Sequence, residues 1–245
     1  MGSLRVRHFL PSRAIRRVLL HPALLVGSLL SVVGVSAVLS ATVGFAAGLP
    51  IASKPLTTQT AASTVPVSTC TLTASADDYV AQDDNSDFGS ATELHVQSYQ
   101  TTVVLLTTQR NRRSFVKFDL SSCSIPAVAR VTSATLSVFL STAPTLNRTW
   151  NVSRVTSSWS ENNIAWPGPT ATASTSVTTG TTSNVTRSAN VTSDVASFVS
   201  GSQTNHGWRF SDSAENSVTQ RNGQFRSREF GTASQRPTLV INYYP

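Results

Sequence analysis

The sequence Val-Thr-Ser-Ala-Thr-Leu-Ser-Val-Phe-Leu at residues 131–140 decides the fold class. Every second residue from Ala134 to Leu140 is apolar and falls on one face of the segment, whereas Thr135, Ser137 and Phe139 fall on the other. Such alternation is typical of a strand that has one buried face. The segment therefore predicts a half-buried β-strand.

Short segments with β signals recur on both sides of this strand, separated by turn residues. The other expected strands are Tyr79–Ala81, Glu93–Ser98, Val103–Thr107 (a strand or one arm of a hairpin), Ser114–Leu120, Thr149–Val155, Ser176–Thr186, Gly207–Ser211, Gln224–Phe230 and Pro237–Tyr244. Between them, residues 159–169 are expected to form a long irregular loop. Many short strands broken by turns predict an antiparallel β-sandwich or jelly roll.

One segment has helical spacing instead. Val191, Val195, Phe198 and Val199 recur as on one face of a helix, and Gly201 suits the position after its last turn. Thr192 or Ser193 could cap its N-terminus. The all-β fold is therefore expected to contain one short helix.

The chain of 245 residues carries a formal charge of +7, but this charge is unevenly distributed. Six basic residues and no acid precede residue 70, which leaves 13 basic residues against 12 acids in the remainder. The excess charge belongs to the N-terminal tail, so it gives no support to nucleic-acid binding by the domain. The low share of charged residues, 13%, fits an exported β protein.

The first 69 residues indicate export. Residues 1–50 contain a basic start followed by the apolar run His21–Leu49, which predicts a signal peptide or a signal-anchor membrane segment. Residues 51–69 are rich in Thr, Ser and Pro and are expected to form a linker. The folded domain then spans residues 70–245, outside the cell, and is either anchored to the membrane or secreted.

The two cysteines, Cys70 and Cys123, both follow the apolar run. In an oxidising compartment we expect them to form a disulfide that ties the start of the domain to a later strand. The alternative is a pair of buried free thiols.

An acidic turn lies near the start of the domain. Asp83, Asn85 and Asp87 have the one-three-five spacing of a calcium loop, although the later positions do not follow an EF-hand. One structural calcium ion could bind these residues together with Asp78, backbone carbonyls and a distant acid such as Asp212 or Glu229. Alternatively, the acidic and amide side chains cap their own backbone turns.

Arginines and tryptophans are the candidates for ligand binding. Arg110, Arg112 and Arg113 form one group and Arg226 and Arg228 another, and a groove of such residues would suit an anionic polysaccharide. Trp159 and Trp166 could stack on sugar rings if exposed, or could lock the irregular loop against the core. Each arginine could equally be paired with one of the acids, and for Arg228 such a structural partner is expected.

Catalysis has little support in the sequence. The domain contains two of the chain's four histidines, and neither a zinc-binding spacing nor a nucleophile or phosphate-loop motif occurs. Glu161 and Asp212 could form a carboxylate pair in space, which the sequence does not reveal. We therefore expect a protein that is not an enzyme.

Several motifs, taken in order, resemble a known family. They are Ala-Asp-Asp-Tyr-Val at 76–80, Asn-Ser-Asp-Phe-Gly-Ser at 85–90, Phe-Val-Lys-Phe-Asp-Leu-Ser at 115–121, Val-Thr-Ser-Ala-Thr-Leu-Ser-Val at 131–138, Ser-Ser-Trp-Ser-Glu-Asn-Asn-Ile-Ala-Trp at 157–166, Val-Thr-Ser-Asp-Val-Ala-Ser-Phe-Val-Ser-Gly at 191–201, Ser-Arg-Glu at 227–229 and Arg-Pro-Thr-Leu-Val-Ile-Asn-Tyr at 236–243. Together they resemble the DNRLRE domain family, which is related to disaggregatase repeats and similar to alginate-binding carbohydrate-binding modules. The resemblance implies a jelly-roll β-sandwich of the kind usually attached to extracellular polysaccharide-degrading enzymes or surface proteins.

Three functions follow as hypotheses. The first is an exported, non-catalytic module that binds an extracellular acidic polysaccharide. The second is a structural or adhesive surface protein whose sandwich does not bind sugar, and the third is a small polysaccharide lyase or hydrolase. The residues favour the first hypothesis over the second and the second over the third.

Overall fold

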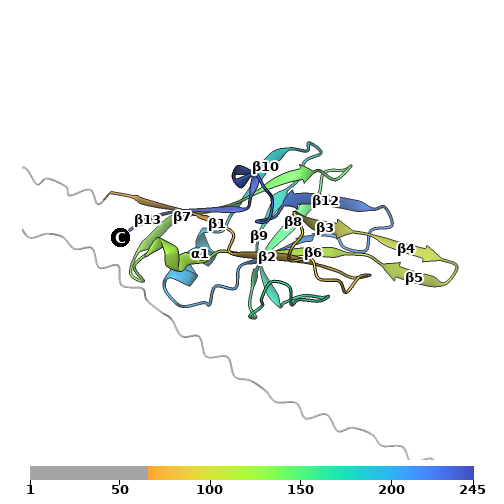
Figure 1. Cartoon of the computed structure of the whole chain (residues 1–245), viewed down its shortest axis with the longest axis horizontal. Coiled ribbons are helices and arrows are strands. Elements are labelled where there is room, and N and C mark those ends of the chain that lie inside the picture. Colours follow the sequence, from red (N-terminus) through yellow and green to blue (C-terminus); the bar gives the residue numbers. More distant parts are fainter. Residues whose placement is uncertain (1–65) are drawn as a thin grey trace, which may run out of the picture. The chain divides into compact units, whose positions relative to one another are not determined.

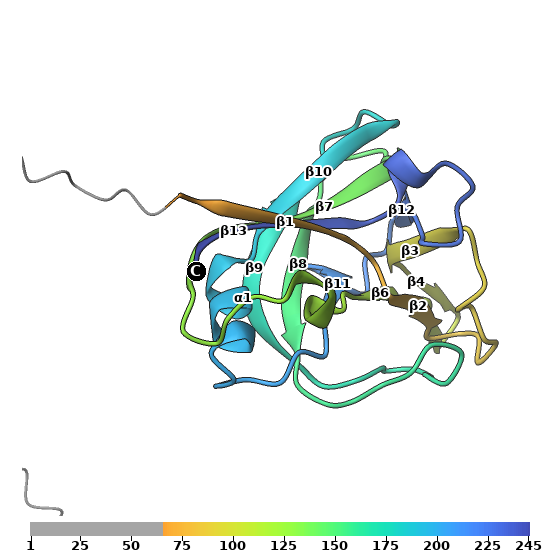
Figure 2. The same ribbon diagram turned by 60° about the vertical axis from the view of Figure 1, so that its left-hand side comes forward.

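The computed structural model describes residues 66–245, which form an antiparallel β-sandwich with one short helix (Figures 1 and 2). This confirms the predicted fold class. The strands are β1 (Ser68–Thr73), β2 (Ala76–Ala81), β3 (Glu93–Ser98), β4 (Gln100–Val103), β5 (Leu106–Gln109), β6 (Arg112–Lys117), β7 (Arg130–Thr142), β8 (Thr149–Val155), β9 (Ala171–Thr178), β10 (Val185–Asn190), β11 (Trp208–Asp212), β12 (Arg221–Arg226) and β13 (Thr238–Tyr244). The helix α1 spans Thr192–Val199, and the short 3₁₀ turns η1 and η2 span Leu120–Cys123 and Ala233–Gln235.

Two strands organise the sandwich. The long strand β7 pairs with β10 along one edge, and with β13 and then β12 along the other. Strand β6 pairs with β2 along one edge and with β11 along the other, where β3 adds a single pair. Strands β8 and β9 extend the sheet beyond β11, and β1 extends it beyond β13. All of these pairings are antiparallel.

The main core is formed by the inward faces of these strands. The apolar side chains of β7 predicted to share one face, from Ala134 to Leu140, are all buried in it. Val116 and Phe118 also point into this core, whereas Phe115 lies in a second apolar cluster on the opposite face of β6. The predicted alternation along β6 is therefore confirmed, and both of its faces are covered.

Four of the predicted strands cross a turn or run past the end of the observed strand. Val103–Thr107 contains the tip of the β4–β5 hairpin, which projects from the end opposite the C-terminus (Figure 1). Ser176–Thr186 contains the turn between β9 and β10, and the strand expected at Gln224–Phe230 already ends at Arg226. Ser114–Leu120 runs past the end of β6 into η1.

The first strand of the domain crosses the predicted boundary at residue 70. Strand β1 begins at Ser68, inside the expected linker, because its backbone pairs with β13 from Ser68↔Tyr243 to Thr73↔Thr238. The predicted disulfide is confirmed: Cys70 in β1 is bonded to Cys123 in η1.

The predicted helix is confirmed at residues 192–199, but its N-terminus is capped differently. Val191 occupies the capping position and makes no side-chain cap. Instead, the Asn190 carboxamide oxygen accepts a hydrogen bond of 3.0 Å from the Thr192 amide. Gly201 adopts φ +73° beyond the last turn, as its predicted role requires.

No helix within residues 66–245 is long and apolar enough to cross a membrane. The expected signal or membrane segment at residues 1–50, and most of the linker, lie outside the described residues.

Candidate functional site

The irregular loop at residues 156–170 lies over the outer face of β6. The Trp159 indole packs against Phe115 with ring centroids 6.0 Å apart, and its N–H donates a 2.7 Å hydrogen bond to the His206 carbonyl. Gly168 adopts φ +82°, and a Cβ atom there would lie 2.4 Å from the Phe115 ring. Only glycine fits this position, so the backbone of the loop rests directly on Phe115.

Trp159 remains partly exposed between two open grooves. The first, of about 570 Å³, is lined by the loop itself, including Ser158, Asn163 and Pro169. The second, of about 710 Å³, lies between the loop, the end of β6 and η1. Since the indole lines both, it presents an aromatic surface that is held in place from below.

The second groove combines this indole with polar side chains. Lys117 at the end of β6, Asp119, Thr204 and Asn205 line it. Asn205 is fixed by a 2.8 Å hydrogen bond from its side-chain amide to the Phe118 carbonyl. Lys117 takes part in none of the ion pairs found among the described residues. This groove therefore offers a ring face, a cation and hydrogen-bonding groups.

Trp166 is held at the far end of the loop by Arg113. The Arg113 guanidinium lies 4.2 Å from the centre of the Trp166 ring and donates two hydrogen bonds of 2.7 Å to Glu215. It also donates to the Pro167 carbonyl at 3.1 Å. Such a bidentate pair occupies most of the guanidinium's donors, so Arg113 positions the loop.

The other predicted arginines also contact partners within the domain. Arg110 lies 3.5 Å from Asp83, Arg112 lies 3.3 Å from the His95 ring nitrogen, and Arg226 is paired with Glu93 and lies over the Phe230 ring. Arg228 is paired with Glu161 and Glu229, which confirms its expected structural partner. None of the five arginines lines either groove beside Trp159.

The side chains of the acidic turn mainly bind their own backbone. Asp84 accepts from the Ser86 amide at 2.8 Å and Asp87 from the Gly89 amide at 3.1 Å. Asp83 and Asn85 are exposed, and Asp83 faces Arg110. Asp78 is buried on β2, and its carboxylate accepts hydrogen bonds from the amides of Tyr79 and Asn162. Burial raises the pKa of Asp78 to about 6, although these two hydrogen bonds lower it. The local capping alternative is thus realised at two positions, and the four suggested calcium ligands form no cluster in the described residues.

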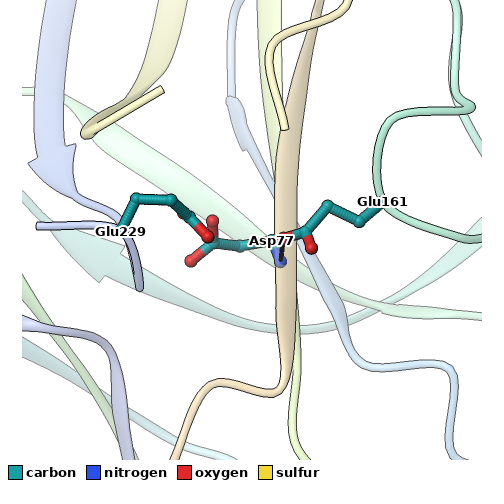
Figure 3. Close-up of side chains that lie close together, drawn as sticks. All are labelled: Asp77, Glu161 and Glu229. Atoms are coloured by element: carbon teal, nitrogen blue, oxygen red, sulfur yellow. Dashed lines mark hydrogen bonds between the residues drawn. The ribbon is translucent and has the colours of Figure 1, made fainter. Parts of the chain in front are cut away.

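A different group of acids does converge. Oxygen atoms of Asp77, Glu161 and Glu229 all lie within 4.8 Å of one another (Figure 3). The three residues come from β2, from the loop at 156–170 and from the segment after β12. The Glu161 carboxylate accepts from the Asp77 amide at 2.9 Å and from the Arg228 guanidinium at 2.8 and 2.5 Å. Glu161 therefore joins the loop to the edge of β2 that pairs with no strand in the described part of the chain.

Asp77 is completely buried in this cluster. One of its carboxylate oxygens accepts a 2.8 Å hydrogen bond from the Arg228 amide. Burial raises the pKa of Asp77 to about 8, the Arg228 amide opposes this shift, and the neighbouring carboxylates of Glu229 and Glu161 add to it. The possible Glu161–Asp212 pair does not occur, because Asp212 is bound to Arg148 at 2.9 and 2.5 Å.

Sequence reasoning did not identify Lys117 and Asn205 as groove residues or the convergence of Asp77 with Glu229. The available signal was their position: Asp77, Lys117, Glu161 and Glu229 all lie inside the motifs that carry the family resemblance. Nothing in the sequence shows that these motifs meet in space.

The chain matches a model of a known protein family. The model of carbohydrate-binding module family 96 matches residues 68–243, which run from the start of β1 into β13. This agrees with the expected relation to carbohydrate-binding modules, while the narrower DNRLRE assignment has no separate support. No curated protein matches the chain.

Proposed function

Since the chain belongs to carbohydrate-binding module family 96, we propose that it binds an extracellular polysaccharide through the surface around Trp159. The proposal rests on the position of Trp159, which lines both grooves. Its indole is fixed by the hydrogen bond from its N–H to the His206 carbonyl and by packing against Phe115. A fixed aromatic ring loses little conformational entropy when a sugar stacks on it. Modules of this kind are typically non-catalytic, so we propose binding without turnover.

We propose further that the polysaccharide is acidic and that Lys117 recognises its carboxylates. The arginines first considered for this role are engaged with acids or rings of the domain, whereas Lys117 lines the groove. An ammonium group opposite a uronate carboxylate would favour acidic over neutral polymers, and salt would weaken the preference.

We also propose that binding takes place outside the cell. The disulfide between Cys70 and Cys123 supports this location, because such bonds persist in oxidising compartments. The basic and apolar N-terminal sequence is in keeping with export.

Affinity electrophoresis of the purified full-length chain in gels that contain alginate or a neutral glucan tests the proposal. Trp159→Ala should weaken binding about 30-fold, the equivalent of about 2 kcal/mol at a buried aromatic contact. Lys117→Gln should lower the affinity for alginate but leave that for the neutral polymer unchanged. Arg130→Gln, a change outside both grooves, serves as the matched control.

Circular dichroism of each variant establishes that the fold is kept. Retention of the wild-type chain by neither polymer would contradict the proposal and favour a structural or adhesive role. Equal binding by wild type and Trp159→Ala would place the site elsewhere on the domain.

A further inference from the structure

Two carboxylate oxygens in the cluster beside the loop have no hydrogen-bond partner among residues 66–245. One is Oδ1 of Asp77, whose side chain is completely buried. The other is Oε2 of Glu229, an atom that is buried although the residue as a whole is only partly so. Figure 3 shows the two carboxylates pointing toward each other. A buried carboxylate oxygen without a hydrogen bond costs stability, so this pair calls for a positively charged partner.

The charges of the cluster lead to the same conclusion. Asp77, Glu161 and Glu229 carry three negative charges when ionised, and Arg228, which contacts Glu161 at 2.5 Å and Glu229 at 2.8 Å, supplies one positive charge. With all three carboxylates ionised, two negative charges lack compensation within the cluster, where Asp77 is wholly removed from water. A divalent cation would neutralise them, because its charge equals this excess.

We propose that Asp77, Glu161 and Glu229 form a calcium site. Carboxylate oxygens are the ligands that hard cations prefer, and no sulfur or imidazole ligand belongs to the group. Calcium bonds of about 2.3–2.6 Å place opposite ligand oxygens up to about 5 Å apart, which accommodates oxygens that lie within 4.8 Å of one another. The unpartnered oxygens of Asp77 and Glu229 would be its closest ligands, and Glu161 would contribute while still bound to Arg228.

The position of the site gives the ion a structural role. Its ligands come from β2, from the loop that carries Trp159 and from the segment after β12, three parts of the chain that are far apart in sequence. An ion bound to all three would hold the loop against the sandwich. This site is distinct from the acidic turn at Asp83, Asn85 and Asp87, where the sequence suggested calcium.

Calcium titration of the full-length chain after removal of divalent ions with EDTA tests the proposal. Isothermal titration calorimetry should show saturable binding of one calcium ion. At a hundredfold excess over the dissociation constant, calcium should raise the midpoint of thermal unfolding by about 5–11 °C. Magnesium should have a smaller effect, because it requires shorter bonds and retains its waters.

Two variants locate the site. Asp77→Asn and Glu229→Gln should each remove both the binding heat and the thermal shift, whereas the control Asp83→Asn should keep them. Glu229 is only partly buried, so Glu229→Gln keeps the test decisive if Asp77→Asn does not fold.

Absence of binding by the wild type would overturn the proposal and leave a proton shared between Asp77 and Glu229 as the explanation of the pair. Binding that survives Glu229→Gln, or that is lost in Asp83→Asn, would overturn it as well.

Discussion

Removal of the disulfide should destabilise the domain by about 4 kcal/mol. Cys70 and Cys123 are separated by 53 positions, and closing a loop of this length in the unfolded chain corresponds to about 14 cal/mol/K, or about 4 kcal/mol at 25 °C. For a domain of this size, that loss should lower the midpoint of thermal unfolding by about 8–16 °C. The bond also holds β1, whose one strand neighbour within residues 66–245 is β13, so amide exchange should rise first in β1.

Urea unfolding of the double variant C70A/C123A, followed by tryptophan fluorescence, measures this change. The reduced wild type is the matched control, because it loses the covalent bond but retains the volume of both sulfur atoms. Both proteins should lose similar amounts of stability if chain entropy dominates. A loss below about 1 kcal/mol in both would refute the reasoning, and a large loss in the variant alone would assign the effect to packing.

Three further predictions concern single residues. Burial and the nearby Arg112 lower the pKa of His95 to about 4, so the folded protein keeps the ring neutral while the unfolded chain binds a proton below about pH 6.5; stability from this residue should therefore fall as the pH falls from about 6.5 to 4. Burial of Asp77 and Asp78 has the opposite effect on the pH dependence of stability, so wild type must be compared with His95→Gln. The difference between their free energies of unfolding, measured in urea, should change by about 2–3 kcal/mol over this pH range after allowance for solvent screening. A difference that does not vary with pH would contradict the prediction. Gly207→Ala should lower the free energy of unfolding by about 3 kcal/mol, because the residue has φ +78° and the new Cβ would lie 2.2 Å from the Val116 carbonyl oxygen. Gly201→Ala, at φ +73° with open space around it, should lower it by about 1 kcal/mol. Equal midpoints of thermal unfolding in the two variants would argue against the steric clash at Gly207. Glu215→Gln should weaken the Arg113–Trp166 arrangement and accelerate proteolytic cleavage within residues 156–170, while Glu93→Gln, which changes another arginine's partner, should leave that rate unaltered.

The strands and the helix were predictable where a local pattern determines them. The bounds of β3 and β8 agree with the expected ones, since buried apolar residues alternate with polar ones along much of each segment. The β4–β5 turn was not predictable, because Val104 adopts φ +59° although β-branched residues rarely occupy this region. The β9–β10 turn did carry a signal, in Gly180 and Asn184 with φ +65° and +59°, which the weak strand pattern across it concealed.

The ligand roles expected for the arginines illustrate a second limit of prediction from the sequence. The sequence shows nearly equal numbers of acids and basic residues but does not say which of them meet. Arg113 in β6 binds Glu215, which follows β11, at a separation of 102 positions, and Arg228, which follows β12, binds Glu161 in the loop at 156–170 at a separation of 67. Long-range pairing of this kind depends on topology, so composition alone overestimates how many arginines remain available for a ligand.

The loop that carries Trp159 is fixed at several points along its length. Trp159 packs on Phe115, the Glu161 carboxylate binds Arg228 and the β2 edge, the Asn162 amide donates to Asp78, and Trp166 stacks on Arg113. Each contact is made to a strand or to the segment after β12, so the loop has irregular backbone but a position determined by the sandwich. A recognition surface arranged in this way does not have to become ordered when it binds a ligand, which favours affinity. The buried Asp77 and the partly buried Glu161 thus contribute to the proposed function indirectly, by fixing the segment that presents the aromatic ring.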